Sequence, residues 1–325
     1  MLSNNLYEEI LLNPASQGAN KLFIVSGYAS AAMAFHHIEE LHKQNHDATV
    51  HLVIGMTVHD GLSLSNHRGF QKLVSDDLSG LFQCNYVINT PPVHSKTYAW
   101  FSNDTPIAGY IGSANYSQRA FSKHQREIMD TCSAETAYAY YNSLLKDTIC
   151  CTHPEAEDFV QIHNYKYRLR RKEEIRLPDT DTAYPEISPS VQGLEHVRVS
   201  LINRYGKISG RSGLNWGHRP NRNRNQAYIP LKADVARTDF FPAPPQHFTV
   251  LTDDGETLIC VRAQDNAKAI ETPHNNSQLG EYFRYRMGEG DGHFITMADL
   301  IEYGRTHIDF YKTDEETYYM DFSTE

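Results

Sequence analysis

The stretch H-S-K-T-Y-A-W-F-S-N-D-T-P-I-A-G-Y-I-G-S-A-N, from His94 to Asn115, decides the fold of the N-terminal half. From Lys96 the side chains alternate up to a Ser-Asn-Asp turn, and residues 106–111 form an apolar run that ends at a glycine. Two such runs around a short polar turn predict a β-hairpin. Alternation along the first strand puts His94 and Lys96 on one face, so both can reach one ligand.

The polar residues of this hairpin suit a phosphate diester. A neutral imidazole at His94 can attack phosphorus, and the cation of Lys96 can neutralise a non-bridging oxygen. Ser113 and Asn115 add neutral donors for the same oxygens. We expect Gly112 to let the backbone come close to the phosphate. Taken alone, Ser113 and Asn115 also fit an ordinary turn after a strand, and an H-x-K pair by itself is weakly specific.

With its spacing of about 16 residues, the whole string resembles the H-x-K…G-S-x-N signature of the phospholipase D superfamily. The resemblance implies chemistry through a phosphohistidine, with neither metal nor cofactor. The superfamily pattern usually has an aspartate five residues after the lysine, where this chain has Phe101. A different carboxylate is then needed to hold the imidazole in the right tautomer and orientation.

The NgoFVII-type and BfiI-like restriction endonucleases of this superfamily are similar to this chain in that respect. They have a glutamate about a dozen residues after the asparagine, and Glu127 matches that position. We therefore expect Glu127 to orient His94. The alternative for Glu127 is a solvent-facing strand residue.

The chain contains a single H-x-K pair. Phospholipases of the superfamily usually carry two copies, because one histidine is the nucleophile and the other protonates the leaving oxygen. A single copy implies that two chains supply the pair across a two-fold axis. The chemistry therefore predicts a homodimer, formed through the N-terminal domains, with one composite active site.

At 325 residues the chain is long enough for about two domains. The N-terminal half alternates expected strands with expected helices, which predicts an α/β domain with a mixed sheet covered by helices. The expected strands are 21–27, 48–56 and 82–89, and the expected helices are 30–46, 67–75 and 134–146. In the first of these helices, histidines 36, 37, 42 and 46 are expected on a polar face rather than as metal ligands. We place the nuclease domain at 1–171, a proline-containing linker at 172–192 and a C-terminal domain at 193–325.

The C-terminal part begins with a local excess of positive charge. Between His196 and Ala233 there are eight Lys or Arg residues and no Asp or Glu, in a chain whose formal net charge is −10. Such a patch is what contact with nucleic-acid phosphates requires. The alternative is an RNA-binding or merely solvated basic loop.

Two polar segments there are expected to bind DNA: a first arm, residues 211–225, and a second arm, residues 272–286, expected as a loop. Arginine suits guanine and asparagine suits adenine in the major groove. The expected DNA-binding residues are Arg211, Asn215, Trp216, His218, Arg219, Arg222, Arg224, Asn225, Asn275, Asn276, Ser277, Gln278, Arg284 and Arg286. The aromatic residues Tyr282, Phe283 and Tyr285 are expected in the core.

Short strands are expected around the arms, at 197–202, 227–231, 248–251 and 258–262. The strings S-G-L-N-W-G-x-R-P and N-N-S-x-L-G-E-Y-F-R are similar to those of the NgoFVII-type enzymes. That resemblance implies a mainly β DNA-binding pseudobarrel, which these enzymes share with plant transcription-factor domains.

Over nearly the whole chain, the resemblance implies a metal-independent type II restriction endonuclease that cleaves double-stranded DNA at specific sites. Related enzymes are encoded beside methyltransferases and some work with an ATPase partner, a point that the sequence leaves open. Two rival functions are a non-specific phosphodiesterase or phospholipase and a DNA-binding regulator with a silent catalytic domain.

The N-terminus has no basic region followed by an apolar run, so no signal peptide is expected. No apolar run approaches the ~20 residues of a membrane span. The five cysteines are scattered and odd in number, which is typical of a reducing cytoplasm.

Overall fold

A computed structural model describes residues 1–122, 125–163, 191, 193–203 and 205–324. They form two compact units. The first contains Met1–Leu62, Asn66–Ile162 and Gln246–Thr249, and the second contains Ser63–Ser65, His163–Pro245 and Val250–Glu325. The linker expected at 172–192 lies almost entirely outside the described residues.

The first unit is built on a seven-stranded mixed sheet with the strand order β7-β6-β5-β1-β2-β4-β8. Its strands are β1 (Lys21–Ser26), β2 (Thr49–Ile54), β4 (Phe82–Val87), β5 (Thr97–Ser102), β6 (Thr105–Gly112), β7 (Met129–Cys132) and β8 (Thr148–Cys150). β1, β2 and β4 are parallel to one another, and the other pairings are antiparallel. The predicted hairpin is β5–β6, in which Thr97 pairs with Ile111.

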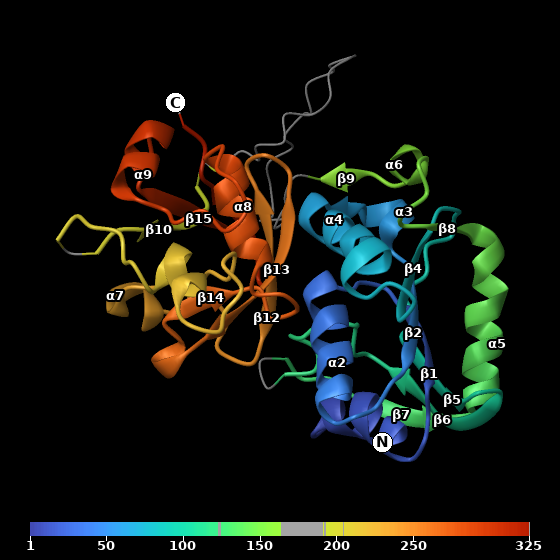
Figure 1. Cartoon of the computed structure of the whole chain (residues 1–325). Coiled ribbons are helices and arrows are strands. Elements are labelled where there is room, and N and C mark those ends of the chain that lie inside the picture. The colour runs from blue at the N-terminus through green and yellow to red at the C-terminus, as the bar shows by residue number, and fades with distance from the viewer. Residues whose placement is uncertain (123–124, 164–190, 192, 204, 325) are drawn as a thin grey trace. The chain divides into compact units, whose positions relative to one another are not determined.

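Helices cover both faces of this sheet, as predicted: in Figure 1, α5 lies on one side of the strands and α2 and α4 lie on the other. Their bounds are α2 (Ala31–Lys43), α4 (Leu64–Lys72) and α5 (Ala134–Leu144). The shorter helices are η1 (Tyr7–Leu12), α1 (Asn13–Ser16), α3 (Thr57–Asp60), η2 (Leu73–Asp77), η3 (Leu145–Asp147) and α6 (Ala156–Phe159). A separate two-stranded ribbon joins β3 (Leu62–Ser63) and β9 (Ile162–His163).

Helix α5 is fixed by a cap at its start and by aromatic packing along one face. The side chain of Ser133 accepts a hydrogen bond from the backbone of Thr136 at 3.1 Å, which satisfies one of the free N–H groups of the first turn. The rings of Tyr138 and Tyr141 lie 4.5 and 5.3 Å from the ring of Phe23 in β1. This face holds the helix on the sheet.

The prediction that all four histidines of the α2 region lie on a polar face was wrong for His36 and His37, which are buried. His37 is fully buried, with Nδ1 2.8 Å from the hydroxyl of Tyr116 and Nε2 2.9 Å from the carbonyl of Leu11. A carbonyl can only accept, so Nε2 carries the proton of a neutral ring. Burial lowers the pKa of His37 to about 4.

The second unit is a seven-stranded sheet in the order β10-β15-β16-β12-β13-β14-β11. Its strands are β10 (Glu195–Ser200), β11 (Ile229–Pro230), β12 (His247–Thr252), β13 (Thr257–Ala263), β14 (Ala269–Glu271), β15 (His307–Asp314) and β16 (Thr317–Asp321). β10 and β11, which stand at the two ends of this order, are neighbours in space. The sheet is therefore nearly closed into a barrel, as the predicted pseudobarrel requires.

The helices of the second unit are η4 (Gly213–His218), α7 (Ala233–Ala236), η5 (Asp265–Ala267), α8 (Gln278–Arg286) and α9 (Met297–Tyr303). The prediction of a loop throughout the second arm was wrong, because α8 forms its second half. Leu279, Tyr282 and Phe283 are buried at helical spacing, and this apolar face stabilises the helix against the barrel. Tyr285, expected in the core, is 76% exposed.

Within the described ranges, no helix has both the length and the apolar character needed to cross a membrane. All five cysteines are free thiols.

Candidate active site and DNA-binding surface

The five residues predicted for catalysis all lie where β5, β6 and β7 meet at one edge of the sheet. His94 and Lys96 come directly before β5, and Ser113 and Asn115 directly after β6. Glu127 precedes β7 by two residues and is not within that strand. The hydrogen bond from the backbone N–H of Gly112 to the carbonyl of Lys96, at 3.2 Å, holds the two halves of the signature together.

Lys96 lies against the imidazole of His94, as the alternation of the sequence predicted. Its Nζ is 3.2 Å from Nε2 and 3.3 Å from Nδ1 of His94, and it donates to the His94 carbonyl at 2.8 Å. His94 is exposed, whereas Lys96 is buried. Burial lowers the pKa of Lys96, an effect that the nearby carboxylate of Glu127 opposes.

Glu127 contacts Ser113 rather than His94 in the part of the chain that the structure describes. The hydroxyl of Ser113 donates to Oε2 of Glu127, and the side-chain amide of Gln125 donates to Oε1. Glu127 is buried, so the solvent-facing alternative does not apply. The Ser113 oxygen also accepts from the backbone N–H of Ile128 at 3.0 Å, which fixes Ser113 from two sides.

The side-chain amide of Asn115 is oriented by two residues that the sequence reasoning missed. Its Oδ1 accepts from the backbone N–H of Tyr28 at 3.2 Å and lies 3.5 Å from the hydroxyl of Ser26. Among the described residues its Nδ2 has no partner, so this N–H₂ group is available to a ligand. Ser26 is the last residue of β1, and Tyr28 lies two residues beyond it; the pairing of β1 with β5 that brings them to the site has no signal in the local sequence pattern.

Gly112 is required for close packing of β6 against the segment before β7, while its predicted approach to phosphate stays a prediction. A Cβ at this position would lie 2.2 Å from the carbonyl oxygen of Ile128. The glycine therefore lets β6 come close to the segment that carries Glu127. At Gly27, after β1, a Cβ would lie 3.1 Å from the His94 ring, so a larger residue would crowd the site.

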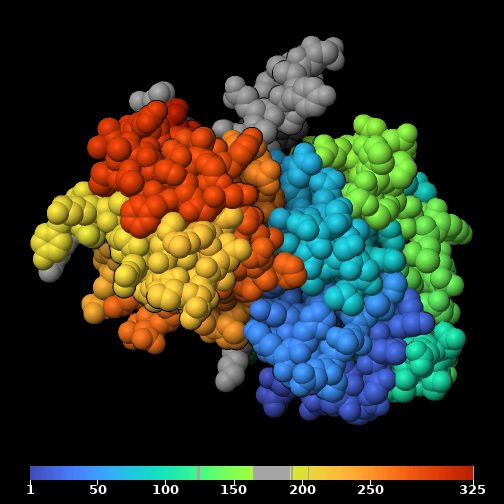
Figure 2. Space-filling model, viewed as in Figure 1, coloured from blue at the N-terminus to red at the C-terminus, as the bar shows by residue number. Residues whose placement is uncertain are grey.

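In the second unit, the four arginines of the first arm are exposed: Arg211, Arg219, Arg222 and Arg224. Figure 2 shows the first arm, in yellow to gold, at the surface of this unit. The guanidinium of Arg222 lies 3.7 Å above the ring of Trp216 and donates to Gln226 at 2.9 Å. Arg219 donates to the carbonyl of Arg211 at 2.7 Å, and Arg224 lies 2.8 Å from Nδ1 of His218.

Other predicted DNA-binding residues lie inside the unit and hold its segments together. Arg284 is 1% exposed and donates to four carbonyl oxygens, those of Gly280, His293, Leu214 and Arg224, at 2.9–3.3 Å. These bonds connect α8 to the first arm. A guanidinium saturated by carbonyl groups is not available to a base edge in this conformation.

Asn215 and Arg286 are similarly engaged. Asn215 is fully buried, and its amide both donates to and accepts from the backbone of Ile295, at 2.7 and 2.9 Å. Arg286 pairs with Asp253 at 2.6 Å and with Asp254 at 3.2 Å. Of the remaining predicted residues, Trp216, Asn225 and Ser277 are buried, His218, Asn276 and Gln278 are half-buried, and Asn275 is exposed.

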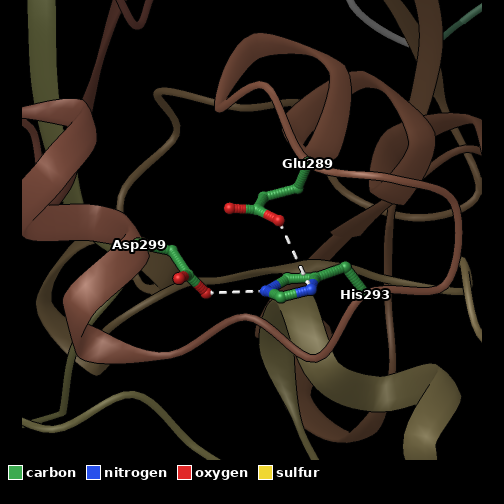
Figure 3. A group of neighbouring side chains, drawn as sticks. All are labelled: Glu289, His293 and Asp299. Atoms are coloured by element: carbon green, nitrogen blue, oxygen red, sulfur yellow. Dashed lines mark hydrogen bonds and ion pairs between the residues drawn. The ribbon is translucent and has the colours of Figure 1, made fainter.

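A group of Glu289, His293 and Asp299 brings together side chains that could hold a metal ion (Figure 3). Nδ1 of His293 lies 3.3 Å from Glu289, and Nε2 lies 3.0 Å from Asp299. Each carboxylate thus contacts a different nitrogen of the same imidazole ring. Asp299 also accepts from the backbone N–H of Thr296 at 2.7 Å, in a capping box that starts α9. The group connects the turn after α8 to α9.

The fold and these two surfaces define a class of protein in which a phospholipase D-like unit is joined to a DNA-binding barrel. Residues 4–158 match the family of the NgoFVII restriction endonuclease N-terminal PLD domain, and residues 190–314 match the NgoFVII C-terminal B3-like DNA-binding domain. The chain belongs to the NgoFVII restriction endonuclease family. These are the domains of a DNA nuclease.

Among solved structures, NucT from Helicobacter pylori is similar to this chain at 13% sequence identity with a TM-score of 0.32. The similarity covers 46% of this chain and 96% of NucT. No curated protein sequence matches the chain.

Proposed function

We propose that the protein is a type II restriction endonuclease that cleaves double-stranded DNA at specific sites without a metal ion. The observation that carries this proposal is the contact between the buried ammonium of Lys96 and the exposed imidazole of His94, at the edge of the sheet where Asn115 follows β6. A nucleophile and two donors at one point are what attack on a phosphodiester needs. The family membership and the DNA-binding domain make DNA the substrate.

In the proposed reaction, a nitrogen of His94 attacks phosphorus, an N–P bond forms and the P–O bond to the leaving oxygen breaks. His94 of the partner subunit gives that oxygen its proton. Water then gives a proton to that partner imidazole and attacks the phosphohistidine, which breaks the N–P bond and frees His94. Lys96 and Asn115 hold the non-bridging oxygens. Because the hydroxyl of Ser113 donates its hydrogen bond to Glu127, we assign these two residues to positioning the loop after β6.

Two further features support the proposed homodimer. Ile111 and Ile128 are 47% and 52% exposed; Ile111 lies in β6 two residues before Ser113, and the carbonyl of Ile128 accepts from the backbone N–H of Ser113. Exposed apolar side chains beside an incomplete active site suit a self-complementary contact. The contact would bring the second histidine to the leaving oxygen.

For DNA recognition we propose a smaller DNA-contacting surface than the sequence predicted, with some of its residues reading bases and others contacting phosphates. It consists of the exposed arginines of the first arm, together with His218, Asn275, Asn276 and Gln278. Arg284, Arg286 and Asn215 are assigned to the internal structure of the arms. We also retain as proposals the domain limits 1–171 and 193–325, a cytoplasmic location and a cognate methyltransferase, and we leave open an ATPase partner.

The test is a digest of unmodified plasmid and phage DNA in excess EDTA, with sequencing of the fragment ends. We expect discrete fragments whose ends share a common sequence at a fixed distance, and no cleavage by His94→Ala. A smear with random ends would indicate a non-specific phosphodiesterase. Cleavage only after magnesium is restored would replace the phosphohistidine with metal-assisted hydrolysis.

A further inference from the structure

The segment that follows β1 touches both halves of the signature. Tyr28 lies two residues beyond the end of β1, and the neighbouring Ala29 forms a parallel bridge with Tyr116. This places Tyr28 between the asparagine and the histidine of the candidate site. Its side chain is half-buried, so the ring is part of the wall of the site.

The backbone of Tyr28 fixes the direction of the Asn115 amide. Its N–H donates to Oδ1 of Asn115 at 3.2 Å, and its carbonyl accepts from the buried hydroxyl of Ser26 at 2.6 Å. The same hydroxyl accepts from the backbone N–H of Tyr116 at 2.9 Å. The oxygen of the amide is thereby held by the protein, and within the described part of the chain its nitrogen has no partner.

The ring of Tyr28 meets the ring of His94 edge-on. The two ring centroids are 5.9 Å apart and the ring planes are 78° from parallel. This arrangement is favourable for aromatic pairs and limits rotation of the imidazole. Among the described residues, the second contact that restrains His94 is the one with Lys96, since Glu127 bonds to Ser113 and Gln125.

The phenol of Tyr28 is anchored in turn by a carboxylate at the end of α3. Its hydroxyl donates to Oδ2 of Asp60, and Oδ1 of Asp60 lies 2.7 Å from Nδ1 of His59. Burial, together with the hydrogen bond to Asp60, raises the pKa of Tyr28 to about 12. The phenol therefore remains a protonated donor at neutral pH, and this chain of contacts ends on the His94 ring.

We propose that Tyr28, anchored by Asp60, is the positioning residue that orients the His94 imidazole for attack. The carboxylate that the superfamily pattern would supply at position 101 is replaced indirectly, through an aromatic ring, by Asp60. Glu127 orients the serine instead. The inference rests on the proposed function, since it assigns His94 as the nucleophile.

The experiment measures the single-turnover cleavage rate, the duplex Kd and the urea midpoint of the full-length protein and its variants. Tyr28→Ala removes the ring, Tyr28→Phe keeps the ring and removes the anchor, and Asp60→Ala removes the anchor from the other side. Tyr140→Phe is the matched control, because the hydroxyl of Tyr140 bonds to Ser95 at 2.8 Å and makes no contact with His94.

We expect Tyr28→Ala to lower the single-turnover rate by roughly 10- to 100-fold, with Kd and urea midpoint unchanged, because misorientation of a nucleophile is costly. Tyr28→Phe and Asp60→Ala should each lower it by roughly 3- to 10-fold. The double variant Tyr28→Phe/Asp60→Ala should be no slower than the slower single variant, since both substitutions remove the same hydrogen bond between Tyr28 and Asp60. Tyr140→Phe should cleave at the wild-type rate.

A wild-type rate for Tyr28→Ala, beside an inactive His94→Ala, would overturn this inference and leave the proposed function intact. Multiplicative losses in the double variant would also overturn it, because the two side chains would then act separately. If Tyr28→Ala is unfolded, Tyr28→Phe and Asp60→Ala decide the question by the same comparison. An inactive wild-type protein would refute the proposed function, and the inference would fall with it.

Discussion

Replacement of Arg284 tests whether the arms of the DNA-binding unit depend on a buried guanidinium. Arg284→Met keeps most of the aliphatic volume and removes four charge-assisted hydrogen bonds to the carbonyls of Gly280, His293, Leu214 and Arg224. A hydrogen bond to a charged group contributes about 1.5–3 kcal/mol, and bonds made by one side chain are not additive. We therefore expect the free energy of unfolding of this unit to fall by about 4 kcal/mol.

The assay is urea unfolding of the full-length protein, followed by tryptophan fluorescence, with hydrogen exchange to locate the change. Each unit contains one of the two tryptophans, Trp100 and Trp216, so both report on unfolding. Exchange should increase in peptides from residues 212–226 and 278–293. Arg211→Met is the matched control: it removes an exposed arginine of the same arm and should leave the urea midpoint unchanged.

This reasoning would be refuted by an Arg284→Met protein with the wild-type urea midpoint and with relaxed specificity at one base pair. That result would mean that the side chain leaves its four carbonyl partners to read DNA.

Three further predictions concern the core, the dimer and the DNA-contacting surface. Since the pKa of His37 is about 4 in the folded chain and 6.5 is its ordinary value, the unfolded state binds more protons between these pH values. Protonation of this one group in the unfolded state should lower the free energy of unfolding by about 3 kcal/mol as pH drops from 6.5 to 4. Because burial also lowers the pKa of His36, to about 3, His37→Gln should reduce the pH dependence in urea titrations without abolishing it, and an unchanged slope would contradict the assignment. Ile128→Glu should give a monomer by analytical ultracentrifugation that binds duplex without cutting it, and a fully active monomer would disprove the composite site. Arg222→Ala, which removes the guanidinium held on Trp216, should relax specificity at one position by ~1–3 kcal/mol in a gel-shift series over single-base variants. Arg211→Ala should instead weaken binding to all the base variants alike and reduce the slope of log affinity against log salt concentration by about 1. A uniform loss of affinity for both Arg222→Ala and Arg211→Ala would show that the first arm only contacts the DNA backbone.

The sequence was sufficient for the part of the site that depends on strand alternation. His94 and Lys96 share a face because they are two residues apart before β5, and the hairpin register then brings Asn115 to the same edge. The alternation of side chains along a strand can be predicted without knowing the rest of the fold. Tyr28 and Asp60 could not be found in this way, because only the pairing of β1 with β5 and the position of α3 bring them to His94.

Burial of polar residues was the main failure of the sequence reasoning. Arg284 and Asn215 lie in polar, glycine-containing segments, where Arg and Asn are ordinarily exposed. Their burial is made possible by backbone carbonyls and amides that approach from distant segments, such as the backbone of Ile295. A local pattern carries no information about such partners. The buried His36 and His37 illustrate the same limit within a helix.

The failure to predict helix α8 is a different kind of error, because the sequence contains an apolar pattern that indicates a helix. Leu279, Tyr282 and Phe283 recur at the spacing of one helix face, directly after a polar Asn-Asn-Ser segment. The many polar residues of the second arm outweighed this short pattern. The second arm thus combines a partly exposed loop with a helix whose apolar face is buried.

The most direct test of the central claim is the stereochemical course of cleavage at a phosphorothioate of defined configuration. The account predicts two successive in-line displacements, first by His94 and then by water, and therefore net retention of configuration at phosphorus. Inversion would show that water attacks the phosphodiester directly, and it would contradict the assignment of His94 as the nucleophile.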